Sequence, residues 1–154
     1  MKPFHFSTNV RPEWVDYNGH MNDAEYARVF SLAVDALIEA IGLDENAREK
    51  ESYTIFTLET HICYLQEAHE KEELSVHMQL LNHDTKRLHI FFSMKNSSGD
   101  LIATSEQMLM GINTKANRPA PFPEAIMTTV ETMMKDHDQL EVPKQAGRTI
   151  GIKK

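Results

Sequence analysis

Apolar positions are most concentrated between Ala24 and Ile41, where the chain is almost continuously helix-compatible. Beyond the first turn of this segment only four polar residues interrupt it, far fewer than a surface helix carries. They are Arg28, Ser31, Asp35 and Glu39. The pattern therefore predicts a long helix that other elements wrap on most sides. Asn22 with Glu25 three residues later predicts a capping box at its start, and Gly42 suits its end.

Five other segments alternate apolar with polar residues, as β-strands with one buried face do. They are residues 4–10, 52–65, 74–80, 88–94 and 101–112, and the last four follow one another like a meander. A polar helical turn is expected at 44–51 and an amphipathic helix at 124–135, with Ile126, Val130 and Met133 or Met134 facing inward. This order predicts an α+β fold in which an antiparallel sheet of about five strands wraps around the long helix. Because a single sheet leaves unpaired edges, we expect a homodimer or homotetramer.

Length and composition narrow the functional classes. A chain of 154 residues with 41% hydrophobic content suits one domain, which we place at residues 1–138. A polar tail follows at 139–154 and is expected to be partly mobile or to dock on a partner subunit. The net charge of −7, without a Lys or Arg cluster, argues against nucleic acid or an anionic membrane as a partner. With one cysteine and no leader-like or membrane-length apolar run, we expect a cytoplasmic protein.

The polar loop before the long helix holds the strongest candidates for chemistry. Asp16 lies one tight turn before the helix, where unpaired backbone N–H groups can face a partial negative charge such as an acyl carbonyl oxygen. Gly19 suits a turn in which a Cβ would meet backbone or ligand. The structural alternatives are a turn-capping Asp16 and an ordinary loop glycine.

Four other side chains are candidates to bind substrate, each with a structural alternative. Trp14 is either a core residue or part of a pocket wall, and His20 either acts in the site or packs against the helix start. One face of the predicted strand at 52–65 carries Tyr53, Ile55, Thr57, Glu59, His61 and Cys63. On this face Glu59 and His61 line a pocket or form a buried pair. There is no His-Glu-x-x-His motif and no third ligand beside His61 and Cys63, so we expect no metal and no other cofactor.

The loop and helix start also resemble a known family. Asp16, Gly19, Asn22 and Tyr26 match the Asp-x-x-Gly-x-x-(Tyr or Asn)-x-x-x-Tyr pattern of the hotdog-fold thioesterases, in particular the 4-hydroxybenzoyl-CoA thioesterase-like group. This resemblance covers most of the chain and implies the hotdog fold, an acyl-CoA substrate and thioester hydrolysis. It implies that Asp16 is the general base or the nucleophile. It also implies that the N–H near Asp23 polarises the thioester carbonyl while Asn22 shapes the turn.

A closer resemblance is carried by three segments, Trp14–Met21, Ser52–Tyr53 and Glu59–His61. They look like the thioesterases associated with carnitine catabolism, which are thought to act on betainyl-CoA. For such an acyl group, the ring of Trp14, Tyr17 or Tyr26 would suit the trimethylammonium. The charge of Glu59 would add Coulomb attraction. The alternative function is an acyl-CoA-binding or sensor module without catalysis on the same fold.

Overall fold

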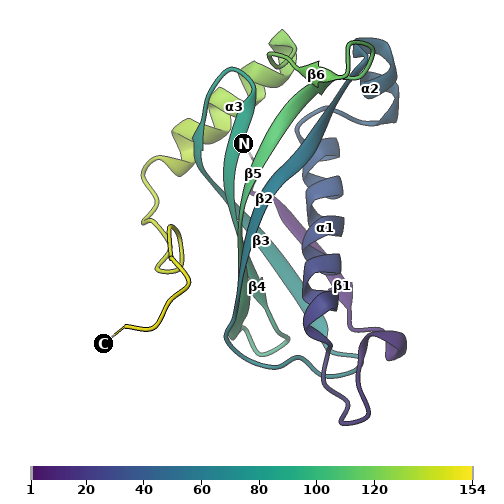
Figure 1. The fold of residues 1–154 in the computed structure, drawn as a ribbon, viewed down its shortest axis with the longest axis vertical. Coiled ribbons are helices and arrows are strands. Elements are labelled where there is room, and N and C mark those ends of the chain that lie inside the picture. Colours follow the sequence, from purple (N-terminus) through teal and green to yellow (C-terminus); the bar gives the residue numbers. More distant parts are fainter. Residues whose placement is uncertain (1, 154) are drawn as a thin grey trace.

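A curled antiparallel sheet is the central element of the computed structural model, which describes residues 2–153 (Figure 1). The strands are β1 (His5–Asn9), β2 (Tyr53–Tyr64), β3 (Glu73–His83), β4 (Arg87–Lys95), β5 (Leu101–Asn113) and the short β6 (Arg118–Pro119). They are ordered β1-β3-β4-β5-β2, and β6 pairs with β5. The predicted α+β architecture is confirmed. The outermost residues of the expected domain and tail, Met1 and Lys154, lie outside the described residues.

Helix α1 (Asp23–Ala40) is the predicted long helix and lies against one face of the sheet (Figure 1). Its buried residues recur every three or four positions and form one stripe. They are Tyr26, Val29, Phe30, Ala33, Val34, Leu37 and Ile38. The opposite side of the helix is exposed and includes Ala24, Ala27 and Leu32. The expectation that other elements wrap this helix on most sides is therefore wrong for the single chain.

Three shorter helical elements complete the chain: η1 (Pro12–Trp14), α2 (Glu45–Glu51) and α3 (Glu124–His137). Ile126, Val130 and Met133 of α3 are buried in the same core as α1, as their spacing predicted. The Nδ1 atom of His137 accepts a hydrogen bond from the backbone N–H of Leu80 at 2.8 Å. Burial lowers the pKa of His137, which favours the neutral ring that such an acceptor requires. Helix α3 thereby closes the edge of β3 beyond its pairing with β1.

The segment after α3 lies over the face of the sheet opposite α1 (Figure 1). Its Gly147 N–H donates to Glu106 Oε1 at 2.7 Å, and Gln79 Nε2 donates to the carbonyl of Glu141 at 3.3 Å. These hydrogen bonds hold the tail against the sheet of its own chain. The sequence had instead suggested a partly mobile tail or one that docks on a partner subunit. No helix in the described part of the chain is long and apolar enough to span a membrane.

A β-bulge interrupts strand β2 at Leu58. Thr57 pairs with Leu109 of β5, but Glu59 pairs with the very next residue, Met108, so Leu58 is the extra residue. Side chains of a strand alternate between the two faces, and one inserted residue reverses the alternation beyond it. Tyr53, Ile55 and Thr57 were predicted to share a face with Glu59, His61 and Cys63. That prediction is wrong, because the bulge turns the latter three residues to the outer face.

Candidate active site

The loop between η1 and α1 is a closed turn that presents Asp16. Its two sides are joined by a β-bridge between Val15 and Met21 and by a 2.9 Å hydrogen bond from Asp16 N–H to the His20 carbonyl. Gly19 N–H donates to the Asp16 carbonyl at 2.9 Å. Gly19 has φ +78°, a left-handed conformation that glycine adopts without strain. A Cβ at this position would meet no protein atom within 4 Å, so conformation, and not crowding against the backbone, explains this glycine.

Backbone hydrogen bonds hold the Asp16 carboxylate in one orientation. Its Oδ1 atom accepts from Asn18 N–H at 2.8 Å and from His20 N–H at 3.1 Å. Oδ2 makes no hydrogen bond with any described residue. A fixed carboxylate with one free oxygen is suited to remove a proton from water or to attack an acyl carbon.

The start of α1 leaves backbone donors unused. Asn22 is the N-cap residue, as predicted, but its side chain makes no capping hydrogen bond. The predicted capping box is absent because Glu25 pairs with Arg28 at 2.6 Å and does not return to Asn22. Asp23, the first helical residue, has a backbone N–H without an acceptor among residues 2–153. This N–H, at the positive end of the helix, is suited to bind an oxyanion.

A cavity of about 470 Å³ joins these groups at the start of α1. Its lining combines the loop, the first turn of α1 and the end of β2 with the segment that follows it. The lining residues are Asp16, His20, Met21, Asn22, Asp23, Tyr26, Tyr64, Leu65, Gln66 and Glu67. The structure therefore brings together five candidates that the sequence suggested: Asp16, His20, Asn22, Asp23 and Tyr26. It adds Tyr64 and Glu67, which sequence reasoning missed because they lie 38 to 51 residues along the chain from these candidates and belong to no motif.

A close contact with Glu67 holds the His20 ring at the edge of this cavity. Nδ1 of His20 lies 2.5 Å from Oε2 of Glu67. The ring also makes an edge contact with His69, at 5.0 Å between ring centres, and the backbones of His20 and His69 form a β-bridge. A carboxylate on one ring nitrogen orients the imidazole and leaves the other nitrogen available. The arrangement of His20 and Glu67 thus resembles the base-and-orienting-group pairs of hydrolases.

Tyr26 connects the helix start to the segment after β2. Its hydroxyl donates to the Gln66 carbonyl at 3.3 Å and accepts from Ala68 N–H at 3.1 Å. Burial raises the pKa of Tyr26, so the phenol stays neutral and keeps both hydrogen bonds. Tyr26 as a whole is only 4% exposed. Tyr26 therefore fixes the position of one cavity wall relative to the helix.

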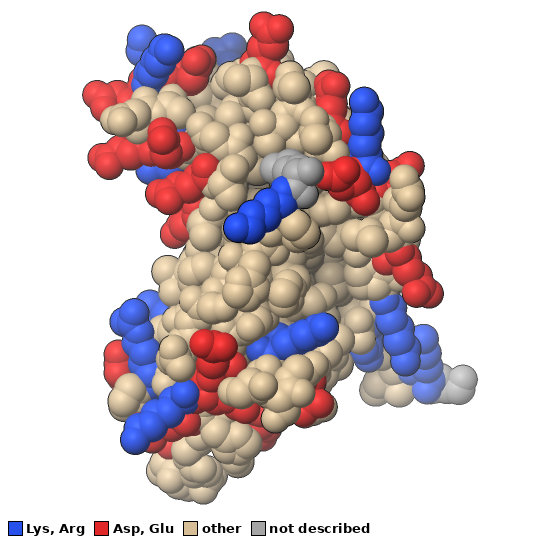
Figure 2. Space-filling view, turned by 180° about the vertical axis from the view of Figure 1, so that it is seen from behind, with Lys and Arg blue, Asp and Glu red and all other residues tan. Residues whose placement is uncertain are grey.

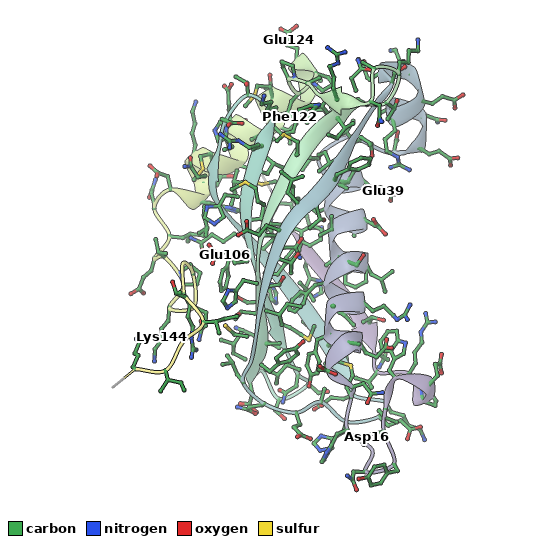
Figure 3. All side chains as sticks on the ribbon, viewed as in Figure 1. Asp16, Glu39, Glu106, Phe122, Glu124 and Lys144 are labelled. Carbon is green, nitrogen blue, oxygen red and sulfur yellow. The ribbon has the colours of Figure 1, made fainter. Side chains whose placement is uncertain are left out.

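Other predicted binding residues lie elsewhere. Trp14 is buried in the core, with the Arg11 guanidinium 5.3 Å from its ring centre. Tyr17 is 97% exposed and, like Gly19, does not line the cavity. Figure 3 shows Asp16 beyond the start of α1.

Glu59 and His61 line a different cavity, of about 250 Å³, together with His89, Glu106 and Gly147 among others. Figure 3 places Glu106 across the sheet from α1, near the tail that carries Lys144. His89 Nε2 lies 2.6 Å from Glu106, and the contacts of Glu106 with Gly147 and His89 lower its pKa despite burial. The bulge at Leu58 explains why this pair lies on the outer face, away from Asp16.

The active-site cavity is negatively charged. Asp16, Asp23 and Glu67 contribute carboxylates, and no Lys or Arg belongs to its lining among the described residues. Within residues 2–153, no three His, Cys, Asp or Glu side chains are grouped to hold a metal ion. On the face shown in Figure 2, Lys and Arg are interspersed with Asp and Glu and form no continuous basic surface.

Comparisons with known proteins agree with this geometry. Residues 10–130 match the family model described as the thioesterase-like superfamily. The chain is 45% identical to the betainyl-CoA thioesterase of Pseudomonas aeruginosa, over 96% of this chain and 93% of that protein. It is 39% identical to the L-carnitine dehydrogenase/betainyl-CoA thioesterase of Rhizobium meliloti, over 96% of this chain but only 30% of that protein.

A solved structure is similar along the whole chain. It is that of a hypothetical protein from Staphylococcus aureus in complex with CoA, with a TM-score of 0.93 and 36% identity over 99% of this chain and 96% of that one. Together with the family match, this similarity confirms the resemblance drawn from the residues around Asp16. The chain belongs to the thioesterase-like superfamily of hotdog-fold thioester hydrolases.

Proposed function

We propose that this protein hydrolyses a short acyl-CoA thioester, with betainyl-CoA as the preferred substrate, at the start of α1. The observation that carries the proposal is that a free oxygen of Asp16 and the unpaired N–H of Asp23 belong to residues lining the same cavity. Similarity to betainyl-CoA thioesterases supports the acyl group, and similarity to a structure solved with CoA supports the carrier. We also expect a cytoplasmic enzyme.

The chemistry needs one group that attacks and one that stabilises charge. Asp16 either removes a proton from the attacking water or attacks the carbonyl carbon itself and forms a mixed anhydride that water then cleaves. In either route the carbonyl oxygen becomes negative, and Asp23 N–H donates a hydrogen bond to it. The C–S bond then breaks, and we assign to His20 the transfer of a proton to the departing CoA sulfur.

A panel assay tests the substrate class. CoA thiol release is measured with betainyl-CoA, with fatty acyl-CoAs and with an aromatic acyl-CoA at matched concentrations. The proposal predicts release from betainyl-CoA with the highest kcat/KM. Faster turnover of the fatty or aromatic thioesters would overturn the assignment of the acyl group, and binding without release from any of them would favour a sensor module.

Glu67 is proposed as a positioning residue for His20. Glu67→Gln removes the charge that holds the ring, and we expect kcat to fall roughly tenfold with KM nearly unchanged. The matched control is Glu70→Gln, which changes an exposed carboxylate in the same loop that does not line the cavity. Steady-state kinetics of both variants check this prediction. Equal kcat values for the two variants would remove Glu67 from the mechanism.

We propose that the working unit is a dimer formed along β2. Within the described sheet β2 pairs only with β5, so its other edge is unpaired, and Phe56 and Leu58 of this strand are 49% and 54% exposed. Unpaired apolar edges favour pairing with another chain. Two-fold antiparallel pairing would place Thr54, at the start of one β2, near Tyr64 at the end of the partner strand. Each active-site cavity would then lie at the interface.

Phe56→Arg places a charge at this edge. We expect the variant to shift from a dimer to a monomer, because the interface would bury a charged side chain without a partner charge. Light scattering after size-exclusion chromatography measures the mass. Thr132→Arg, on an exposed position of α3 far along the chain from β2, is the control and should remain dimeric. A Phe56→Arg variant with unchanged dimer mass would contradict the proposed interface.

A further inference from the structure

Within the single chain, Tyr64 is the aromatic side chain that the active-site cavity leaves most accessible. It is 50% exposed, whereas Tyr26, the other aromatic lining residue, is 4% exposed. Two contacts fix its ring. Its hydroxyl donates to the Asp23 carbonyl at 3.2 Å, and its ring makes an edge-to-face contact with Tyr26, with centres 5.2 Å apart and planes at 85°. Tyr64 therefore presents a rigid aromatic surface beside the first residue of α1.

The charges around this ring favour a cation. The cavity lining contains the carboxylates of Asp16, Asp23 and Glu67, and the one lining side chain able to become cationic, His20, already pairs with Glu67. Burial and the nearby Asp23 charge raise the pKa of Tyr64, which keeps the phenol neutral and its hydrogen bond intact. Aromatic faces combined with carboxylates are the chemistry that recognises quaternary ammonium groups.

We propose that Tyr64 is the specificity-determining residue of the site and binds the quaternary ammonium of a cationic acyl group on its ring face. The inference rests on the proposed function and names the residue that selects its substrate. In a trimethylammonioacetyl thioester the nitrogen is two bonds from the carbonyl carbon. A carbonyl oxygen held at Asp23 N–H therefore places the cation close to the helix start, where the Tyr64 hydroxyl is anchored to Asp23.

A neutral substrate of the same shape tests the proposal. In 3,3-dimethylbutanoyl-CoA a carbon atom replaces the ammonium nitrogen, so the two thioesters differ chiefly in charge. We expect the wild-type protein to prefer betainyl-CoA by at least roughly tenfold in kcat/KM. Tyr64→Leu keeps apolar bulk but removes the ring, and should lose about tenfold with betainyl-CoA while changing little with the neutral thioester.

Tyr64→Phe keeps the ring and is the matched control. It removes only the hydroxyl that binds the Asp23 carbonyl, and its preference for betainyl-CoA should stay close to that of the wild type. Turnover of the neutral thioester by Tyr64→Leu shows that this variant is folded and active. An unchanged preference in Tyr64→Leu would overturn the proposal, as would equal wild-type kcat/KM for the two thioesters. If the wild type released CoA from neither, the proposed function itself would fail.

Discussion

Asp16→Asn is expected to lower kcat for CoA release by about a thousandfold, the range in which a positioned acid or base contributes. Asparagine retains an Oδ1 atom that can accept the hydrogen bonds of Asn18 and His20, so the loop should keep its shape. It loses the negative charge and the basic Oδ2 atom that both proposed routes require. The initial rate of thiol release from betainyl-CoA, measured at saturation, checks the prediction.

Asp84 offers a matched control for this substitution. Its Oδ1 atom also accepts two backbone N–H groups of its own loop, from Lys86 at 2.9 Å and from Arg87 at 2.7 Å. These contacts lower the pKa of Asp84 to about 2, with the bond from Lys86 N–H as the largest cause. Asp84 does not line the cavity at α1. Asp84→Asn should therefore keep kcat within about twofold, and a comparable loss in both variants would point to loop disruption and not to chemistry.

Asp23→Pro should lower kcat by about a hundredfold, which is the usual effect of deleting one oxyanion donor. Proline has no N–H, and it is well tolerated at the first helical position because that donor has no partner within the helix. The preceding Asn22 has ψ 145°, the extended conformation that a following proline requires. The substitution thus removes the proposed donor with little cost to α1.

Asp23→Ala separates the backbone from the side chain. Alanine keeps the N–H and removes the carboxylate, so its kcat should exceed that of Asp23→Pro by at least tenfold. Circular dichroism and thermal unfolding of both variants establish that α1 is intact. Similar kcat values in two folded variants would show that the Asp23 N–H does not stabilise the oxyanion.

The sequence was sufficient for features that depend on neighbouring residues. Helix α1 follows from an apolar run between a capping residue and Gly42, and the Asp16 turn follows from a glycine that adopts φ +78°. The inward residues of helix α3 were predicted correctly, because the spacing of its apolar residues alone defines its buried stripe. These local signals were enough to place Asp16 beside the start of α1.

Features that depend on strand register could not be predicted. One extra residue at Leu58 reverses the alternation of β2, which moves Glu59 and His61 to the outer face and brings Tyr64 to the side of Tyr26. Whether β2 bulges depends on how it pairs with β5. The residue pattern of β2 alone does not contain that information. Glu67 could not be predicted either, because it reaches His20 only where the segment after β2 returns to the loop.

In the proposed mechanism the Asp16 carboxylate performs the chemistry and is not merely part of a binding surface. Calorimetric titration of betainyl-CoA into the Asp16→Asn variant, with free thiol measured in the same sample, tests this claim most directly. We expect the variant to bind the thioester with an affinity near the KM of the wild type while releasing almost no CoA. Release by the variant at more than a tenth of the wild-type rate would contradict the claim, because catalysis would then proceed without this carboxylate.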